Sequence, residues 1–188
     1  MLGHLGPSAV EAYVEHGKAH CRAAGVAAGG RWCDLGSGAG LPGLILALEA
    51  ESIEVLLLDR STARCEFLRW AVVELMVADR VSVLCAEAAD TASSSTYMGS
   101  FDGVVSRSFG SPPLVAEIAG ALLKPGGRLV VSEPPDGGGR WPDEGLQRTG
   151  LSMVDVVIGP PGFVVLERTS AKQRPCRSWN RMRRQPLF

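Results

Sequence analysis

Asp34-Leu-Gly-Ser-Gly-Ala-Gly-Leu-Pro-Gly43 is the stretch that decides the fold of this 188-residue chain. It follows a short apolar run at 31–35 and opens a second apolar run at 44–50, so it indicates a tight loop between a strand and a helix. Its alternate glycines remove the side chains that would keep a ligand from the backbone amides. The helix behind the loop would point its free N–H groups at that ligand. The stretch therefore predicts a nucleotide-type ligand at the first strand-to-helix connection.

The spacing of the glycines separates two ligand classes. A dinucleotide-binding turn follows G-x-G-x-x-G, but Leu41 stands where its third glycine belongs. The loop instead has an acidic residue ahead of three alternating glycines, a pattern of loops that bind S-adenosylmethionine (SAM): Asp34, Gly36, Gly38 and Gly40. We therefore expect SAM as the cofactor, and a nicotinamide oxidoreductase is disfavoured.

The composition fits one globular domain without a membrane span. Hydrophobic residues make up 46% and charged residues 21% of the chain. No apolar run reaches the ~18 residues that cross a bilayer, and no signal-peptide pattern opens the sequence. The five cysteines include no C-x-x-C pair, so we expect neither a disulfide framework nor a zinc site, and a cytoplasmic location. His16 and His20 have a metal-ligand spacing, but without a third ligand we expect an exposed helix face and no metal.

The charge is unevenly distributed along the chain. The net charge is −1, but residues 168–188 contain seven basic and no acidic residues, which leaves −8 on the remainder. Such a basic tail indicates a polyanion partner such as RNA, or only a solvated segment. Trp141 and Trp179 could stack on a base. The candidate RNA-binding residues are Lys172, Arg174, Arg177, Arg181, Arg183 and Arg184.

Strand and helix patterns alternate over most of the chain. They predict an α/β, doubly wound, Rossmann-like methyltransferase sheet of about seven strands, the last antiparallel, with helices on both faces. We expect a turn at 124–127 and irregular backbone at 91–100. The expected organisation is an N-terminal helix (1–28), a SAM-dependent methyltransferase domain (29–169) and a basic C-terminal tail (170–188). The expected strands are 31–35, 53–58, 81–85, 101–106, 128–133, 151–158 and 162–168, and the expected helices 8–24, 44–50, 61–77 and 113–123.

Several candidate site residues follow strands, where open α/β folds bind their ligands. Asp59 ends the second strand and could accept both ribose hydroxyls, or it could cap the next helix. Asp34 could attract the methionine ammonium or could fix the glycine loop. Ala86 and Glu87 follow the third strand and could hold the adenine, or lie on a surface loop. Arg107 follows the fourth strand and could grip a carboxylate or phosphate, or pair with a loop aspartate.

These residues together resemble the GidB/RsmG family. The carriers of the resemblance are Asp34–Gly43, Leu58-Asp59, Arg64-Cys-Glu-Phe-Leu68, Ala86-Glu87, Phe101-Asp-Gly-Val-Val-Ser-Arg-Ser-Phe109 and Leu123-Lys-Pro-Gly-Gly127. The resemblance implies a bacterial enzyme that uses SAM to methylate guanine N7 in small-subunit ribosomal RNA, with the ribosomal RNA or the small subunit as its partner. It places Gly36, Leu41, Ala86, Glu87 and Arg107 at cofactor contacts, and we expect Arg107 to be the catalytic residue.

Two other functions remain open from the sequence. The family's Asn-Leu-Thr motif is absent, which leaves room for a small-molecule methyltransferase on the same scaffold. A non-catalytic protein that associates with RNA or the ribosome is the alternative of another class.

Overall fold

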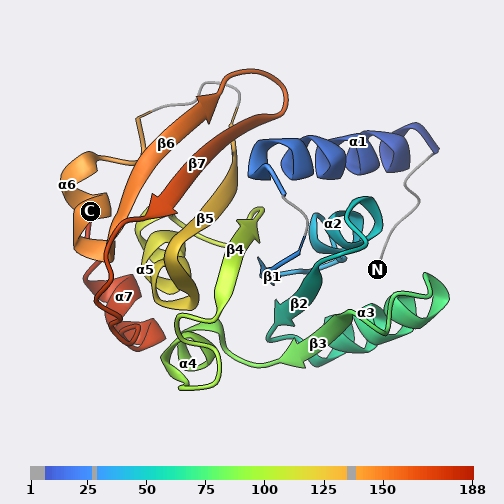
Figure 1. Ribbon diagram of the computed structural model, residues 1–188, viewed down its shortest axis with the longest axis horizontal. Helices are drawn as coiled ribbons and strands as arrows, with labels where there is room; N and C mark the ends of the chain where they lie inside the picture. Colours follow the sequence, from blue (N-terminus) through green and yellow to red (C-terminus); the bar gives the residue numbers. More distant parts are fainter. Residues whose placement is uncertain (1–6, 27–28, 135–138) are drawn as a thin grey trace.

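The computed structural model describes residues 7–26, 29–134 and 139–188. Within these ranges the strands form one seven-stranded sheet in the order β3-β2-β1-β4-β5-β7-β6 (Figure 1). The expected doubly wound sheet is therefore confirmed. The expected N-terminal unit, 1–28, is described only between residues 7 and 26. The strands are β1 (Arg31–Leu35), β2 (Glu54–Asp59), β3 (Val81–Cys85), β4 (Phe101–Ser106), β5 (Leu123–Glu133), β6 (Leu151–Val157) and β7 (Gly162–Arg168).

Strand directions place a topological switch point beside the first loop. β1 pairs in parallel with both β2 and β4, so the chain winds outward in two directions from β1. Ser106 at the end of β4 donates a 3.2 Å hydrogen bond to the carbonyl of Leu35 at the end of β1. β7 is antiparallel to β5 and to β6, as the two closing strands predicted. Ligands of open α/β sheets bind at such a switch point.

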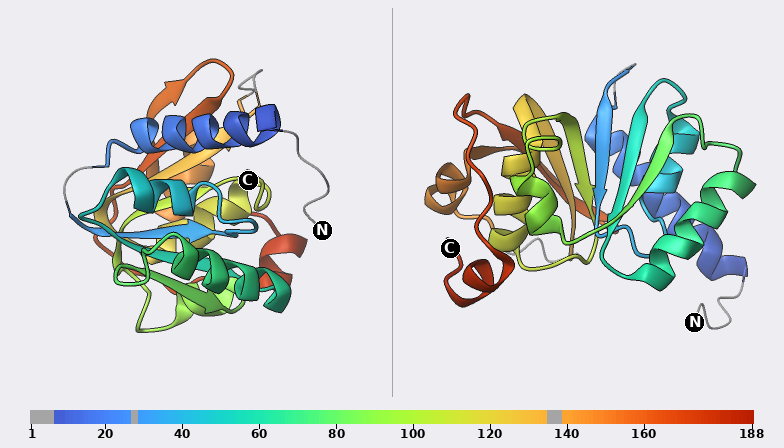
Figure 2. Two further views of the ribbon diagram at one scale, coloured as in Figure 1. Left: turned by 90° about the vertical axis from the view of Figure 1, so that its right-hand side faces the viewer. Right: turned by 90° about the horizontal axis from the view of Figure 1, so that it is seen from below.

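Helices cover both faces of the sheet, as the two turned views in Figure 2 show. Side chains of β2 alternate between them: Val55 and Leu57 pack with α1, α2 and α3, whereas Leu56 and Leu58 pack with α4 and α5. The near-continuous apolar run of β2 is thus explained by burial on both faces. The helices are α1 (Pro7–Ala24), α2 (Gly43–Glu49), α3 (Thr62–Glu74), α4 (Ala88–Ser93), α5 (Pro112–Leu122), α6 (Asp143–Thr149) and α7 (Trp179–Arg184).

The structure corrects some expected elements. The stretch 91–100 is not irregular throughout, because α4 includes its first residues. The turn at 124–127 lies within β5, where the pairing with β4 shifts between Phe101 and Gly103. Two short helices, α6 and α7, were not predicted, since six or seven residues give little periodic signal. Among the described residues, no helix has the length and apolarity to cross a membrane.

Candidate active site

The glycine loop connects β1 to α2 through three left-handed glycines. The φ angles of Gly36, Gly38 and Gly40 are +76°, +57° and +87°, which L side chains adopt at a cost. The amides of Gly36 and Ser37 donate to the carbonyl of Leu58 at 2.9 and 3.0 Å. The loop is therefore fixed to the end of β2 by its own hydrogen bonds.

Two of the three glycines are also required by packing within the chain. A Cβ on Gly36 would meet the ring of Phe109, and one on Gly40 would meet Leu44. At Gly38 no neighbouring atom lies nearer than 3.8 Å to the added carbon. Gly36 and Gly40 thus permit close packing within the chain, and only Gly38 leaves open space at the position of the missing side chain.

Asp34 fixes the far end of the loop. Its Oδ2 accepts a 3.0 Å hydrogen bond from the amide of Gly43, and its residue is 1% exposed. The other carboxylate oxygen, Oδ1, is buried without a hydrogen-bond partner. Burial raises the pKa of Asp34 to about 7, against the smaller opposing effect of the Gly43 amide. The structure thus contains the loop-fixing contact that was one of the two roles considered for Asp34.

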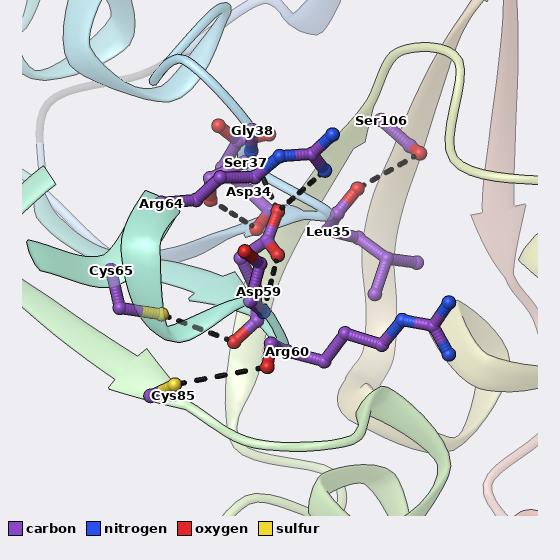
Figure 3. Close-up of polar contacts among 11 residues, drawn as sticks. Asp34, Leu35, Ser37, Gly38, Asp59, Arg60, Arg64, Cys65, Cys85 and Ser106 are labelled. Carbon is purple, nitrogen blue, oxygen red and sulfur yellow. Dashed lines mark hydrogen bonds and ion pairs between the residues drawn. The ribbon is translucent and has the colours of Figure 1, made fainter. Parts of the chain in front are cut away.

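Asp59 ties the glycine loop to the start of α3 (Figure 3). Its Oδ2 accepts a 2.9 Å hydrogen bond from the amide of Gly38, and its Oδ1 a 2.9 Å bond from the amide of Ser61. Arg64 approaches Oδ2 at 3.5 Å from the first turns of α3. The helix-start contact considered from the sequence is therefore present. Each carboxylate oxygen can accept more than one hydrogen bond, so a ligand hydroxyl can still be bound there.

A cavity of about 660 Å³ adjoins the loop, and we call it the loop cavity. Residues 36–39 and Leu41 of the glycine loop line it, and so do Arg64 and Phe67 of α3. Asp34 and Gly40 lie behind this lining. The volume falls within the ~300–1,000 Å³ typical of ligand pockets.

A smaller pocket of about 180 Å³ continues from the loop cavity past Asp59 towards β3. Ala86 and Glu87 line it, as the sequence placed them at this edge. The carboxylate of Glu87 pairs with the exposed Arg60 at 3.3 Å. Trp179 closes the pocket from the C-terminal segment, with Arg60 at 5.8 Å from its ring centre.

Arg107 also lines the loop cavity. Its guanidinium lies over the ring of Tyr13 from α1, 4.7 Å from the ring centre, and in the described part of the chain no carboxylate pairs with it. Ser108 next to it is left-handed, with φ +55°, which is unusual for a residue with a side chain. This turn lets Arg107 contact Tyr13 while Phe109 packs on Gly36. The loop-aspartate salt bridge considered for Arg107 is absent from the described residues.

His16 and His20 do not form an exposed face, so that expectation is wrong. His20 is 0% exposed and its Nε2 lies 3.0 Å from the carbonyl of Val130. Ser132 lies between the two histidines, 2.9 Å from His16 Nε2 and 3.3 Å from His20 Nδ1. Burial lowers the pKa of His20 to about 4, and burial and then Arg107 lower that of His16. The described residues contain no cluster suited to a metal ion.

The C-terminal segment folds back on the domain. Arg177 forms a two-pronged ion pair with Glu117 of α5 at 2.6 and 2.7 Å, and Met182 of α7 is buried in the core. The guanidinium of Arg177 is therefore paired with a carboxylate of the protein itself. The other five candidate RNA-binding residues are exposed: Lys172, Arg174, Arg181, Arg183 and Arg184.

Three wall residues were not predicted as site residues: Tyr13, Arg64 and Phe67. Tyr13 has no motif that could reveal it. Arg64 and Phe67 lie three residues apart on α3, directly after the Asp59 strand, and that spacing could have placed them on one face. Trp141 is 5% exposed and its Nε1 donates to Glu133, so it does not present a free ring for base stacking.

Comparison with known proteins agrees with this geometry. The family model described as GidB, rRNA small subunit methyltransferase G, matches residues 21–133. A protein named ribosomal RNA small subunit methyltransferase G from Mycolicibacterium gilvum is 34% identical over 197 residues, covering 96% of this chain and 83% of the relative. Its namesake from Mycolicibacterium vanbaalenii is 33% identical, covering 87% and 75%.

Solved structures support the fold. A SAM-dependent methyltransferase from Aquifex aeolicus matches with a TM-score of 0.65 and 19% identity, covering 86% of this chain and 93% of that one. The [4+2]-cyclase SpnF matches with a TM-score of 0.62 and 23% identity, covering 76% and 58%. A fold shared with a cyclase does not by itself define an activity. The family match and the sequence relatives identify the family: the chain belongs to the GidB family, whose members are SAM-dependent methyltransferases.

Proposed function

We propose that this protein transfers a methyl group from SAM to N7 of a guanine in small-subunit ribosomal RNA. The observation that carries the proposal is the loop cavity, which combines the family's glycine loop with Arg107 at the switch point of the sheet. The names of the relatives supply the substrate class. The cytoplasm, where ribosomal RNA is available, is the proposed location.

The residues around the loop cavity fit the parts of SAM. Its adenosine would occupy the pocket between Asp59, Ala86 and Glu87, and its methionine part the loop cavity beside Gly38. The Asp59 carboxylate would accept the ribose hydroxyls in addition to its two backbone amides. Asp59→Ala should weaken SAM binding by more than tenfold, because two hydroxyl bonds are worth ~1 kcal/mol or more each. An unchanged dissociation constant would remove the ribose role.

Little acid–base chemistry is required of the protein. Bound SAM supplies an electrophilic methyl group on a sulfonium. The N7 lone pair forms the new C–N bond as the S–C bond breaks, and the positive charge passes from sulfur to the purine. The chain must hold donor and acceptor in line at about 3–3.5 Å, which can supply ~7–11 kcal/mol of the barrier. Arg107 would orient the reactants at the cavity wall.

The exposed cations of the C-terminal segment would contact RNA phosphates. α7 begins at Trp179, which lines the smaller pocket beside Asp59. The basic residues of α7 therefore lie near the proposed site. Replacing Arg181, Arg183 and Arg184 with glutamine should reduce RNA affinity and flatten its dependence on salt, with SAM affinity retained. Substitution is preferable to deletion, because Met182 belongs to the core. If the variant and the wild type bind RNA with equal affinity at low salt, the C-terminal segment does not contact RNA.

The direct test is to map the methylated base. The full chain is incubated with labelled SAM and undermethylated small ribosomal subunits, and the labelled nucleotide is located. We expect label at one guanine and none with Arg107→Ala. Label confined to a small metabolite would favour the small-molecule alternative. Near wild-type turnover of Arg107→Ala would assign that residue a structural role.

A further inference from the structure

A second cavity of about 340 Å³ lies on the other side of Arg107 from the glycine loop. We call it the β5-side cavity. Ser106 of β4 and Ser132 and Glu133 of β5 line it at the carboxyl ends of their strands. Arg107 and Ser108 line both this cavity and the loop cavity. Ligands in the two cavities would therefore meet across the switch point.

Glu133 is a buried carboxylate in the wall of this cavity, with a side chain 2% exposed. Its Oε1 accepts hydrogen bonds from Arg140 Nη2 at 2.7 Å and Trp141 Nε1 at 3.1 Å. Its Oε2 accepts one, from Arg140 Nε at 3.1 Å. A carboxylate oxygen can accept a second hydrogen bond, so Glu133 is oriented by its partners and retains acceptor capacity.

The cavity has hydrogen-bonding groups of opposite kind on neighbouring strands. Arg107 follows β4 and offers only donors, and among the described residues it has no carboxylate partner. Glu133 ends β5, one strand further from the glycine loop, and offers acceptors. The ligand that fits has acceptors on the edge towards the loop cavity and donors on the opposite edge.

Guanine has this arrangement. Its N7 and O6 are acceptors on one edge, and its ring N1–H and 2-amino group are donors on the other. Adenine has no 2-amino group and presents a lone pair at N1, which would face the carboxylate. We propose that the β5-side cavity binds the acceptor guanine and that Glu133 determines this specificity by accepting from the 2-amino group at the one free position of Oε2. Arg107 then donates to O6 and leaves the N7 lone pair directed at the loop cavity. This inference rests on the proposed function.

The test compares guanosine with inosine, which lacks only the 2-amino group, at the mapped acceptor position. Small-subunit RNA carrying either nucleoside is made by ligation, assembled into subunits, and incubated with labelled SAM and the wild-type protein or Glu133→Gln. We expect the wild type to methylate guanosine about tenfold faster than inosine. In Glu133→Gln this ratio should fall to about threefold or less, with the SAM dissociation constant unchanged.

The ratio is taken within one protein preparation, so any loss of folded protein cancels. Glu117→Gln is the matched control, because Glu117 also pairs with an arginine in two-pronged fashion but lies away from both cavities. Its ratio of guanosine to inosine methylation should equal that of the wild type, even where loosening of the C-terminal segment slows both reactions. An equal ratio in wild type and Glu133→Gln would overturn the inference and leave the proposed function standing. No label on guanosine with the wild type would remove both.

Discussion

Gly36 and Gly38 make a pair of substitutions that separates packing from ligand access. Both glycines are left-handed, so alanine at either costs about 1–2 kcal/mol of backbone strain. Only at Gly36 does the added carbon meet another side chain, the ring of Phe109. Overpacking of this kind costs a further ~1–3 kcal/mol. We therefore expect Gly36→Ala to destabilise the protein by about 2–5 kcal/mol and Gly38→Ala by about 1–2 kcal/mol.

The assays are urea unfolding and SAM titration of the same two variants. Gly38 lines the loop cavity and has open space at the position of its missing side chain. Gly38→Ala should therefore weaken SAM binding, although it should unfold at a higher urea concentration than Gly36→Ala. Equal losses of stability in the two variants would refute the packing role of Phe109. Unchanged SAM affinity in Gly38→Ala would refute the placement of the cofactor beside this residue.

Three further outcomes follow from the buried groups. Glu117→Gln should cost about 2–3 kcal/mol and expose the C-terminal segment to protease; this lies below the value for a fully buried pair because Arg177 keeps 22% exposure. An uncut segment would contradict the anchoring role. The pKa of His20 is near 6.5 in the unfolded chain and about 4 in the folded protein. The free energy of unfolding therefore decreases by up to about 3 kcal/mol as pH falls from 6.5 to 4. Relative to wild type, His20→Gln should gain stability on acidification, measured by urea unfolding at each pH, and parallel curves would count against it. Asp34 acts in the opposite sense: its folded pKa of about 7 exceeds the unfolded value, so stability is lost as pH rises from about 4 to 7, and Asp34→Asn should gain relative to wild type over that rise. A constant difference between Asp34→Asn and wild type across this range would refute the shift.

The sequence predicted the sheet and the edge at which the site lies. The buried strand at 54–59 is apolar on both faces, and the glycines of the first loop require positive φ, so both leave local patterns. The sequence placed Asp59, Ala86, Glu87 and Arg107 at this edge because each stands at the end of a strand or just after it, and the carboxyl ends of parallel strands share one edge.

What the sequence could not show depends on contacts between distant segments. Phe109 fills the space above Gly36, and Tyr13 stacks on Arg107 across 94 positions of the chain; neither pairing has a local signal. The histidines of α1 have the spacing of an exposed or ligand-binding pair, but Ser132 and Phe163 of the sheet bury them. The basic C-terminal segment has the composition of a solvated tail. Its anchor is Glu117 of α5, which precedes its partner Arg177 by 60 positions in the chain.

The central claim is that the loop cavity binds SAM. Isothermal titration calorimetry of SAM into the 188-residue protein tests it most directly. We expect one saturable site, and the same titration of Asp59→Ala should show a dissociation constant more than tenfold weaker. The absence of binding heat from the wild-type protein at millimolar SAM would contradict the claim.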